Sequence, residues 1–581
     1  MHPDTTHPSP EPLRRGDFLI LAVFSLIVFG IGLIIPKTLN IHETVGCVNT
    51  REMIANGDLV IPTYGERPWL ERPPLPFWLT AATVIAVDGV NTDWAYRIAP
   101  IIAGLIGVLL TGWIGAMAFG RAIGLMSGCI LATSFEYFMY AKAPESDIFL
   151  ACFVIAAMAM FTRAELGSTT ASDDIRFWGK RRWPVLVFFI FLGMTNLTKG
   201  LIFGTLHVLA PVTGFLLVSM SIRCWLRYIW LWGWLAFLVV GGAWALAAYL
   251  RMPDIMDLWH SDYIGRLKEG AFPQPWWYYL ANLPGAIAPW TPLAFVGLWL
   301  TRPASYRLAE RLIWCWAILP IALFSFADGK HHHYLLPCVP AWAILSAMGA
   351  RRVWQRFKTL PNWMQNPLIA GVVSAVILTP LVIAFARKIP GPEWKVPAVI
   401  VGGSITAMAL CWAWRQSSGR VAFGVTVVVA MGMQWLVYAI DTYYLDKYRE
   451  DMEFVQKAND LVPADASYFV LNDVNALYAS WFIHYTDGRT AMLHNESFLI
   501  DDRITAPEIF VIARAKAQSE LNRYGVVEVV LQSTRTRGEL SPSDRFTLFR
   551  LRFRDDLVRK SANIHISPMQ ATGRWPGPVL Q

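Results

Sequence analysis

Ionisable residues gather in a few short segments of a chain that is otherwise apolar. The densest segment, residues 41–78, reads IHETVGCVNTREMIANGDLVIPTYGERPWLERPPLPFW and carries His42, Glu43, Glu71 and Arg72. Later segments contribute further polar candidates: Lys142, Glu145, Asp147, Lys199, Asp262, Arg266, Lys330 and Tyr334. Carboxylates and imidazoles can take a proton, while cations can hold a phosphate and stabilise its developing charge. This combination suits group transfer from a donor with a phosphate leaving group.

The composition places these residues in a membrane protein. Hydrophobic residues make up 55% of the 581 residues, charged residues only 16%, and the mean hydropathy is +0.40. A soluble protein would be about 25% charged. The net charge of +8 comes without a long basic run, which argues against nucleic-acid binding. Seven cysteines without a CxxC pair predict neither a disulfide framework nor a cysteine metal site.

Thirteen apolar stretches approach the length of about 20 residues that a membrane-spanning helix needs. They are Phe18–Pro36, Arg97–Ala118, Ile123–Tyr140, Asp147–Phe161, Trp183–Thr198, Leu201–Met220, Ile229–Leu250, Trp277–Leu300, Leu312–Ala327, Tyr334–Gly349, Pro367–Phe385, Val396–Trp414 and Ala422–Ile440. The first stretch is longer than a signal-peptide core and has no cleavage site after it, so we expect a retained helix. A further run, Leu75–Val87, is shorter.

The lysines and arginines of the short loops predict an orientation, because cytoplasmic loops carry an excess of them. With the amino terminus inside, thirteen spans place Arg14-Arg15 and Lys180-Arg181-Arg182 in the cytoplasm and the polar segments outside. A fourteenth span at Leu75–Val87 would reverse every later loop. We therefore expect this run to re-enter on the outer side or not to cross.

The pattern changes after the last apolar stretch. Short alternating runs appear, SYFVLN, EIFVIA, VVEVVLQ and FTLFRLRF, with helix-like stretches such as AKAQSELNRYG between them. They predict a small soluble α/β domain. The expected organisation is a cytoplasmic tail at 1–16, a transmembrane catalytic domain at 17–444 with its first outer loop at 37–95, and a periplasmic α/β domain at 445–581.

Six motifs follow one another between residues 17 and 350: REMIANGDLVIPTYGERPWLERPPLPFW, DWAYRIAPIIAGLIG, PESDIFLACF, LTKGL, DYIGRL followed by QPWWYYL, and KHHHYLLPCVPA. In this order they resemble the GT-C glycosyltransferases that use polyprenyl-phosphate sugars. The chain is most similar to the lipid A 4-amino-4-deoxy-L-arabinose transferases and the protein O-mannosyltransferases. The resemblance implies an α-helical polytopic membrane protein with a GT-C-like fold, about 13 transmembrane helices and amphipathic helices in the first outer loop.

The resemblance also implies roles for individual residues. Glu71 and Arg72 match an acidic–basic pair before Pro-Pro that faces the active site, and its basic member contacts the donor phosphate. Asp147 matches the acid of the second outer loop, and Arg266 matches a basic residue associated with the lipid phosphate. The residues expected to bind donor phosphate or substrate are Tyr64, Glu71, Arg72, Lys199, Asp262, Arg266, Lys330 and Tyr334.

The head of the first loop departs from the family pattern. The family has Asp-Glu where this chain has His42-Glu43, and usually has Arg where this chain has Val45. His42 could act as the base, since neutral imidazole is available near pH 7; Glu43 could instead have taken the role, or activity could be altered. Tyr263 replaces a histidine that can join a metal site in the aminoarabinose transferases. We therefore expect no metal and no other cofactor.

The predicted function is transfer of a sugar from an undecaprenyl-phosphate donor to an acceptor at the periplasmic face of a bacterial inner membrane. The acceptor is lipid A, another glycolipid or glycan, or a protein. The catalytic candidates are His42, Glu43 and Asp147. The alternative is a homologue that binds polyprenyl-phosphate lipid with altered catalysis. A transporter or flippase is disfavoured, because the charges gather at helix ends on one side and no paired repeat is visible.

Overall fold

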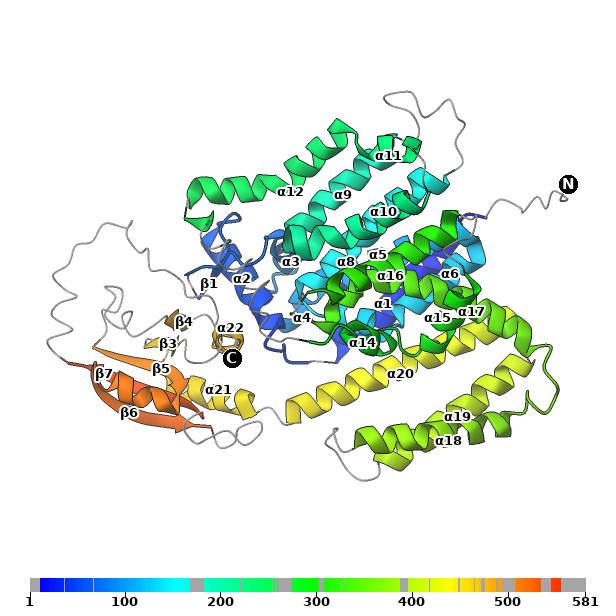
Figure 1. Ribbon diagram of the computed structural model, residues 1–581. Helices are drawn as coiled ribbons and strands as arrows, with labels where there is room; N and C mark the ends of the chain where they lie inside the picture. The colour runs from blue at the N-terminus through cyan, green and yellow to red at the C-terminus, as the bar shows by residue number, and fades with distance from the viewer. Residues whose placement is uncertain are drawn as a thin grey trace.

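The computed structural model shows a helical bundle, a folded insert after the first helix and a small sheet near the end of the chain (Figure 1). The structure describes residues 11–35, 37–65, 67–167, 182–219, 222–252, 254–256, 259, 274–301, 308–327, 329–386, 395–416, 418–447, 450–463, 466–471, 476–486, 490–493, 507–533 and 545–554.

The bundle contains nearly all of the apolar sequence. Its elements are α1 (Arg15–Ile34), α5 (Ile98–Phe119), α6 (Arg121–Ala132), α7 (Phe135–Tyr140), α8 (Ser146–Leu166), α9 (Arg182–Gly200), η2 (Leu201–Thr205), α10 (Leu206–Ser219), α11 (Ile222–Tyr228), α12 (Leu231–Arg251), α14 (Tyr278–Ala286), α15 (Thr291–Leu300), α16 (Leu308–Ser325), η3 (His332–Cys338), α17 (Val339–Phe357), α18 (Pro367–Ala386), α19 (Lys395–Gln416) and α20 (Gly419–Lys447). Each of the thirteen apolar stretches falls on one or more of these helices.

Length and composition identify the helices that could cross a membrane. Within the described residues, eight helical segments are long and apolar enough, and the pair α14–α15, bent by 111°, would make nine. The expected count of about 13 spans stays a prediction. Helix α3 (Leu75–Ala86) has 12 residues and is therefore about 18 Å long, less than the roughly 30 Å hydrocarbon core of a bilayer. Its length fits the expectation that this run does not cross.

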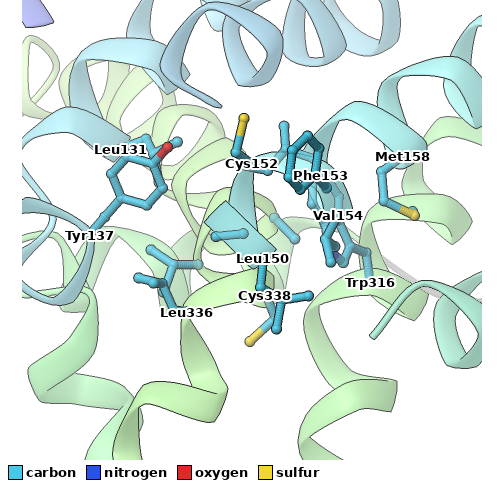
Figure 2. Close-up of a cluster of buried hydrophobic side chains, with 14 of the residues drawn as sticks. Leu131, Tyr137, Leu150, Cys152, Phe153, Val154, Met158, Trp316, Leu336 and Cys338 are labelled. Atoms are coloured by element: carbon cyan, nitrogen blue, oxygen red, sulfur yellow. The ribbon is translucent and has the colours of Figure 1, made fainter. Parts of the chain in front are cut away.

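Helix α8 forms the centre of the bundle. Of the residues in the most apolar part of this helix, 94% are buried inside the protein, as expected for a helix that is apolar on every side. Figure 2 shows its residues Leu150, Phe153 and Met158 packed with Trp316 from α16 and Leu336 from η3. This packing fixes the first turn of α8, which carries Asp147, relative to the rest of the bundle.

The insert between α1 and α5 is folded rather than extended. It consists of α2 (Glu43–Asn56), the two-stranded hairpin β1 (Thr63–Tyr64) and β2 (Arg67–Pro68), α3, and α4 (Asp93–Tyr96). Helix α2 ends at Gly57, whose φ of 68° is the left-handed conformation that favours glycine at a helix end. Trp244 of α12 donates its indole N–H to Val60 O at 2.7 Å, which ties the insert to the bundle.

The carboxyl-terminal region forms a five-stranded sheet with short helices. Its elements are α21 (Glu450–Leu461), β3 (Ser467–Leu471), α22 (Ala476–Tyr485), β4 (Thr490–Leu493), β5 (Glu508–Arg514), η5 (Ala515–Ala517), α23 (Gln518–Leu521), β6 (Gly525–Gln532) and β7 (Phe546–Phe553). The strand order is β4-β3-β5-β7-β6, with β3 parallel to β4 and β5, and β7 antiparallel to β5 and β6. The four alternating runs form β3, β5, β6 and β7, so the predicted α/β fold is confirmed. The domain boundaries stay predictions.

Candidate functional site

The insert lies at one end of the bundle, here called the loop end (Figure 1), and side-chain contacts bring three other segments together with it. The four segments are the insert itself, the second loop at 141–145 with the start of α8, the break after α9, and the start of η3. The meeting brings together most of the described candidates that the sequence singled out. It is therefore the candidate active site.

Asp147 is the centre of this site. Its Oδ1 lies 2.5 Å from Lys199 Nζ and 3.9 Å from His333 Nε2, and 3% of its side chain is exposed. Its place in the first turn of α8 lets the partial positive charge of the helix amino terminus stabilise the carboxylate. A buried carboxylate needs such partners, because an unpaired one would be very costly.

Lys199 reaches Asp147 because its helix is broken at this point. Lys199 has a non-helical backbone (φ −143°), and Gly200 follows with φ +77°, a conformation that glycine adopts without strain. The π-helical turn η2 comes next, and such turns are frequent at functional sites. Lys199 Nζ also lies 5.0 Å from the centre of the Tyr334 ring. Asp147, Lys199 and Tyr334, which the sequence analysis proposed independently, are therefore neighbours in the structure.

Arg72 connects the insert to the same cluster. Its Nη1 donates to Ser146 Oγ at 2.9 Å, and Ser146 directly precedes Asp147. The two prolines after Arg72 end the preceding segment, and α3 begins at Leu75. Glu71 and Arg72 are both half-buried, so the pair lies at the edge of the cluster.

The head of the insert holds Glu43 and His42 differently. Glu43 is 3% exposed; its Oε1 accepts from Arg97 Nη1 at 2.9 Å, and its Oε2 accepts from the Asn40 amide at 2.7 Å. His42 is exposed, yet desolvation by neighbouring groups and the positive charge of Arg72 hold the pKa of its imidazole below the ordinary 6.5. A neutral His42 beside the cluster can accept a proton, whereas both oxygens of Glu43 are already bonded.

Sequence reasoning gave too little weight to two groups of this site. Glu145 is half-buried, and desolvation together with the neighbouring Asp147 raises its pKa to about 8. His332 Nδ1 lies 2.8 Å from Glu136 Oε1, and the adjacent His333 faces Asp147. The KHHHY motif was the available signal, but only the contacts show that neighbouring histidines have different carboxylate partners.

The remaining candidates lie around the cluster or outside it. Lys330 donates to the carbonyl oxygens of Gln274, at 2.8 Å, and Ala327. Tyr64 is 3% exposed and is hydrogen-bonded to Ser480 of α22, so it lies where the insert meets the sheet region. The predicted substrate residues Asp262 and Arg266 lie outside the described residues. The site roles stay predictions.

No group of three or more histidine, cysteine, aspartate or glutamate side chains is arranged to hold a metal ion within the described part of the chain. The cofactor prediction is not tested by this arrangement and stays a prediction.

Gly46 lets α2 approach the second loop closely. A Cβ at this position would lie 2.6 Å from the carbonyl oxygen of Pro144, which belongs to the backbone and cannot easily move. We expect Gly46→Ala to destabilise the protein by about 1–3 kcal/mol, the usual cost of overpacking. Thermal unfolding in a fixed detergent measures the change. Gly30→Ala is the control, because a Cβ there meets no atom within 4 Å; an equal loss in both variants would contradict the expectation.

Comparisons with known proteins agree with this geometry. The family described as dolichyl-phosphate-mannose-protein mannosyltransferase matches residues 47–259. The crystal structure of ArnT from Cupriavidus metallidurans bound to undecaprenyl phosphate superposes with a TM-score of 0.72, at 17% identity, over 92% of this chain and 98% of that one. The fold is that of the ArnT structure. The resemblance to the aminoarabinose transferases and protein O-mannosyltransferases that the sequence motifs indicated is thereby confirmed. The eight long apolar helices within the described residues, together with the shared fold, indicate a multi-pass membrane protein.

Two relatives extend the comparison. The undecaprenyl phosphate-alpha-4-amino-4-deoxy-L-arabinose arabinosyl transferase of Pectobacterium atrosepticum is 27% identical over 349 residues, which are 56% of this chain. The match spans only 58% of that relative's length. The enzyme of the same name, numbered 2, from Proteus mirabilis is 25% identical over 526 residues, which cover 83% of this chain and 89% of the relative. The chain is therefore similar to proteins named as arabinosyl transferases.

Proposed function

We propose that this protein is an integral-membrane glycosyltransferase that moves a sugar from an undecaprenyl-phosphate donor to an acceptor. The observation that carries the proposal is the buried Asp147–Lys199 pair at the loop end, with His333 and Arg72 beside it. Cations around one carboxylate suit a phosphate that gains charge as it leaves. The relatives named as undecaprenyl-phosphate sugar transferases support the same reading.

The proposed reaction is a single displacement with inversion. An acceptor oxygen attacks the anomeric carbon, the new glycosidic C–O bond forms, and the bond to the phosphate oxygen breaks. The acceptor proton passes to His42, whose lowered pKa leaves it neutral near pH 7. Arg72 and Lys199 hold the phosphate leaving group, and Asp147 positions Lys199.

The proposed location is the bacterial inner membrane, with the loop end and the sheet region on the periplasmic side. The basic pairs Arg14-Arg15 and Arg351-Arg352 support this orientation, since α1 begins at Arg15 and the second pair lies in the last two turns of α17, at the opposite end of the bundle (Figure 1). The proposed acceptor is lipid A, another glycan or glycolipid, or a protein.

Purified protein incubated with a radiolabelled sugar on undecaprenyl phosphate tests the function. Labelled lipid A extracted after the reaction is the expected product. If the protein binds undecaprenyl phosphate but transfers no sugar to lipid A, glycan or protein acceptors, it is the lipid-binding homologue and the proposal is wrong. The variant His42→Asp should then be measured, because a gain of activity would show that His42 is the residue that prevents transfer.

The pH profile distinguishes two candidate bases. A base works only when deprotonated, so activity falls as the pH drops through its pKa. With His42 as base, kcat/KM should stay level above pH 6.5 and fall below it, because the pKa of His42 lies under the ordinary value. With Glu145 as base, the midpoint would lie near pH 8. We expect the lower midpoint, and His42→Gln should remove most of the rate.

Arg72→Lys is expected to raise the KM for the donor about tenfold, because lysine cannot reproduce the planar fork that binds phosphate and Ser146 together. Steady-state rates at varied donor concentration measure this change. Arg251→Lys is the matched control, since Arg251 pairs with Asp58 in an exposed bridge with 54% of its side chain accessible. A KM unchanged by Arg72→Lys would remove Arg72 from the phosphate site.

A further inference from the structure

Helix α22 lies directly against the head of the insert, residues 39–51, although more than 400 positions separate them in the chain. Trp481 Nε1 donates to Leu39 O at 3.2 Å, and the Leu39 amide donates to Tyr485 Oη at 2.8 Å. Ser480 Oγ lies 3.0 Å from Thr44 Oγ1. These bonds flank His42 and Glu43 on both sides.

Arg51 closes the far end of the same helix. Its Nη2 donates to Ile483 O at 2.9 Å, and its Nη1 donates to His484 O at 3.2 Å. The last carbonyl groups of a helix have no partner inside the helix, and a cation is favoured there by the helix dipole. The insert therefore supplies one cap of α22, and Asn459 of α21 supplies another by donating its side-chain amide to Tyr485 O at 2.9 Å.

Tyr485 and His484 extend these bonds to α4. Tyr485 Oη donates to Asp93 Oδ2 at 2.8 Å, and His484 Nε2 lies 2.9 Å from Asp93 Oδ1. Asp93 begins α4, and Arg97 follows it four residues later. Arg97 then binds Glu43, so the polar contacts lead from α22 back to the head of the insert.

A second attachment holds the start of the insert. Lys37 Nζ lies 2.5 Å from Asp441 Oδ2 near the end of α20, which leads into the sheet region. Arg97 Nη2 also donates to Lys37 O at 3.1 Å. Both sides of His42 are thus fixed by residues from the last third of the chain.

We propose that α22 is a positioning element for the catalytic site, which orders the insert head and so fixes His42 beside Asp147 and Arg72. The inference rests on the proposed function. It assigns a task to the carboxyl-terminal region through directed bonds to the backbone of Leu39 and to α4, in addition to apolar packing. The described hydrogen bonds of α22 go to the insert, α4 and α21 and not to His42, Asp147 or Arg72, so α22 acts through the insert.

Tyr485→Phe tests the inference in the full-length protein. The variant keeps the ring but removes the hydroxyl that serves both Leu39 and Asp93. We expect kcat to fall about tenfold, because small misplacements of a catalytic group cost this much or more, while affinity for undecaprenyl phosphate stays within about twofold. Backbone hydrogen exchange in residues 39–51 should become faster.

Two controls separate positioning from general weakening. Tyr249→Phe makes the same chemical change on an exposed residue of α12 and should alter neither kcat nor the hydrogen exchange of residues 39–51. Leu521→Ala weakens a core on the sheet, with Phe549 and Leu551, away from α22, and should leave kcat unchanged. An unchanged kcat in Tyr485→Phe despite faster exchange, or the same kcat loss in Leu521→Ala, would overturn the inference. If wild-type protein transfers no sugar, the proposed function fails; unchanged exchange in Tyr485→Phe would then reject α22 as the ordering element.

Discussion

Asp147→Asn is expected to lower kcat/KM for sugar transfer by about a hundredfold or more, because the variant loses the negative charge that holds Lys199 and His333. Asparagine has nearly the same shape and keeps one acceptor oxygen, so the change removes charge rather than volume. Initial rates with a radiolabelled sugar on undecaprenyl phosphate measure the loss. Thermal unfolding in the same detergent shows whether the variant is folded.

The loss is expected to be large because Lys199 depends on its partner. Lys199 sits at the break between α9 and η2, where its backbone is not helical, and its ammonium group is buried against Asp147 and the Tyr334 ring. Without the carboxylate, the ammonium group loses the acceptor that aims it into the site. A misdirected cation stabilises the leaving phosphate poorly, so kcat should fall more than donor affinity.

An apolar pair separates catalysis from folding. Breaking one partner of a buried ion pair costs about 3–5 kcal/mol, whereas replacing both partners with apolar residues is often neutral. We expect Asp147→Leu combined with Lys199→Met to unfold near the wild-type temperature and to remain inactive. Wild-type rates in this double variant would show that the pair only supports the fold.

The sequence predicted the elements well and their contacts poorly. Apolar length located the helices of the bundle except α11 (Ile222–Tyr228), which lies between two of the predicted stretches, and alternation located β3, β5, β6 and β7, because both patterns are local. Strand β4 has only four residues, and α22 follows β3 after a short connection, so neither gives a periodic signal of its own. The docking of α22 on the insert depends on contacts across the whole chain.

The site shows the same limit. Asp147 and Lys199 were both candidates, but they pair because the helix is broken at Gly200. A single glycine in an apolar stretch does not by itself predict such a break. Arg97 was expected only as the start of an apolar stretch, and its contact with Glu43 spans 54 positions. Motif resemblance found these residues individually, whereas the tertiary fold decides which of them face each other.

Arg97→Met is expected to lower the free energy of unfolding by about 3–5 kcal/mol, because it leaves Glu43 as a buried charge without its partner. The two side chains are 3% and 4% exposed, so water cannot replace the lost contact. Arg97 also donates to Lys142 O at 2.8 Å and to Lys37 O at 3.1 Å, so the variant releases three segments at once. Thermal unfolding and the yield of folded protein in detergent measure the loss.

The double variant Arg97→Met with Glu43→Leu decides what Glu43 does. If Glu43 supports the insert, removing both charges should restore part of the lost stability and bring back measurable transfer. If Glu43 takes the acceptor proton, the double variant should fold and remain inactive. We expect transfer to return, since both carboxylate oxygens are occupied by Arg97 and the Asn40 amide, which leaves His42 as the group free to accept the proton. An inactive but folded double variant would return the catalytic role to Glu43.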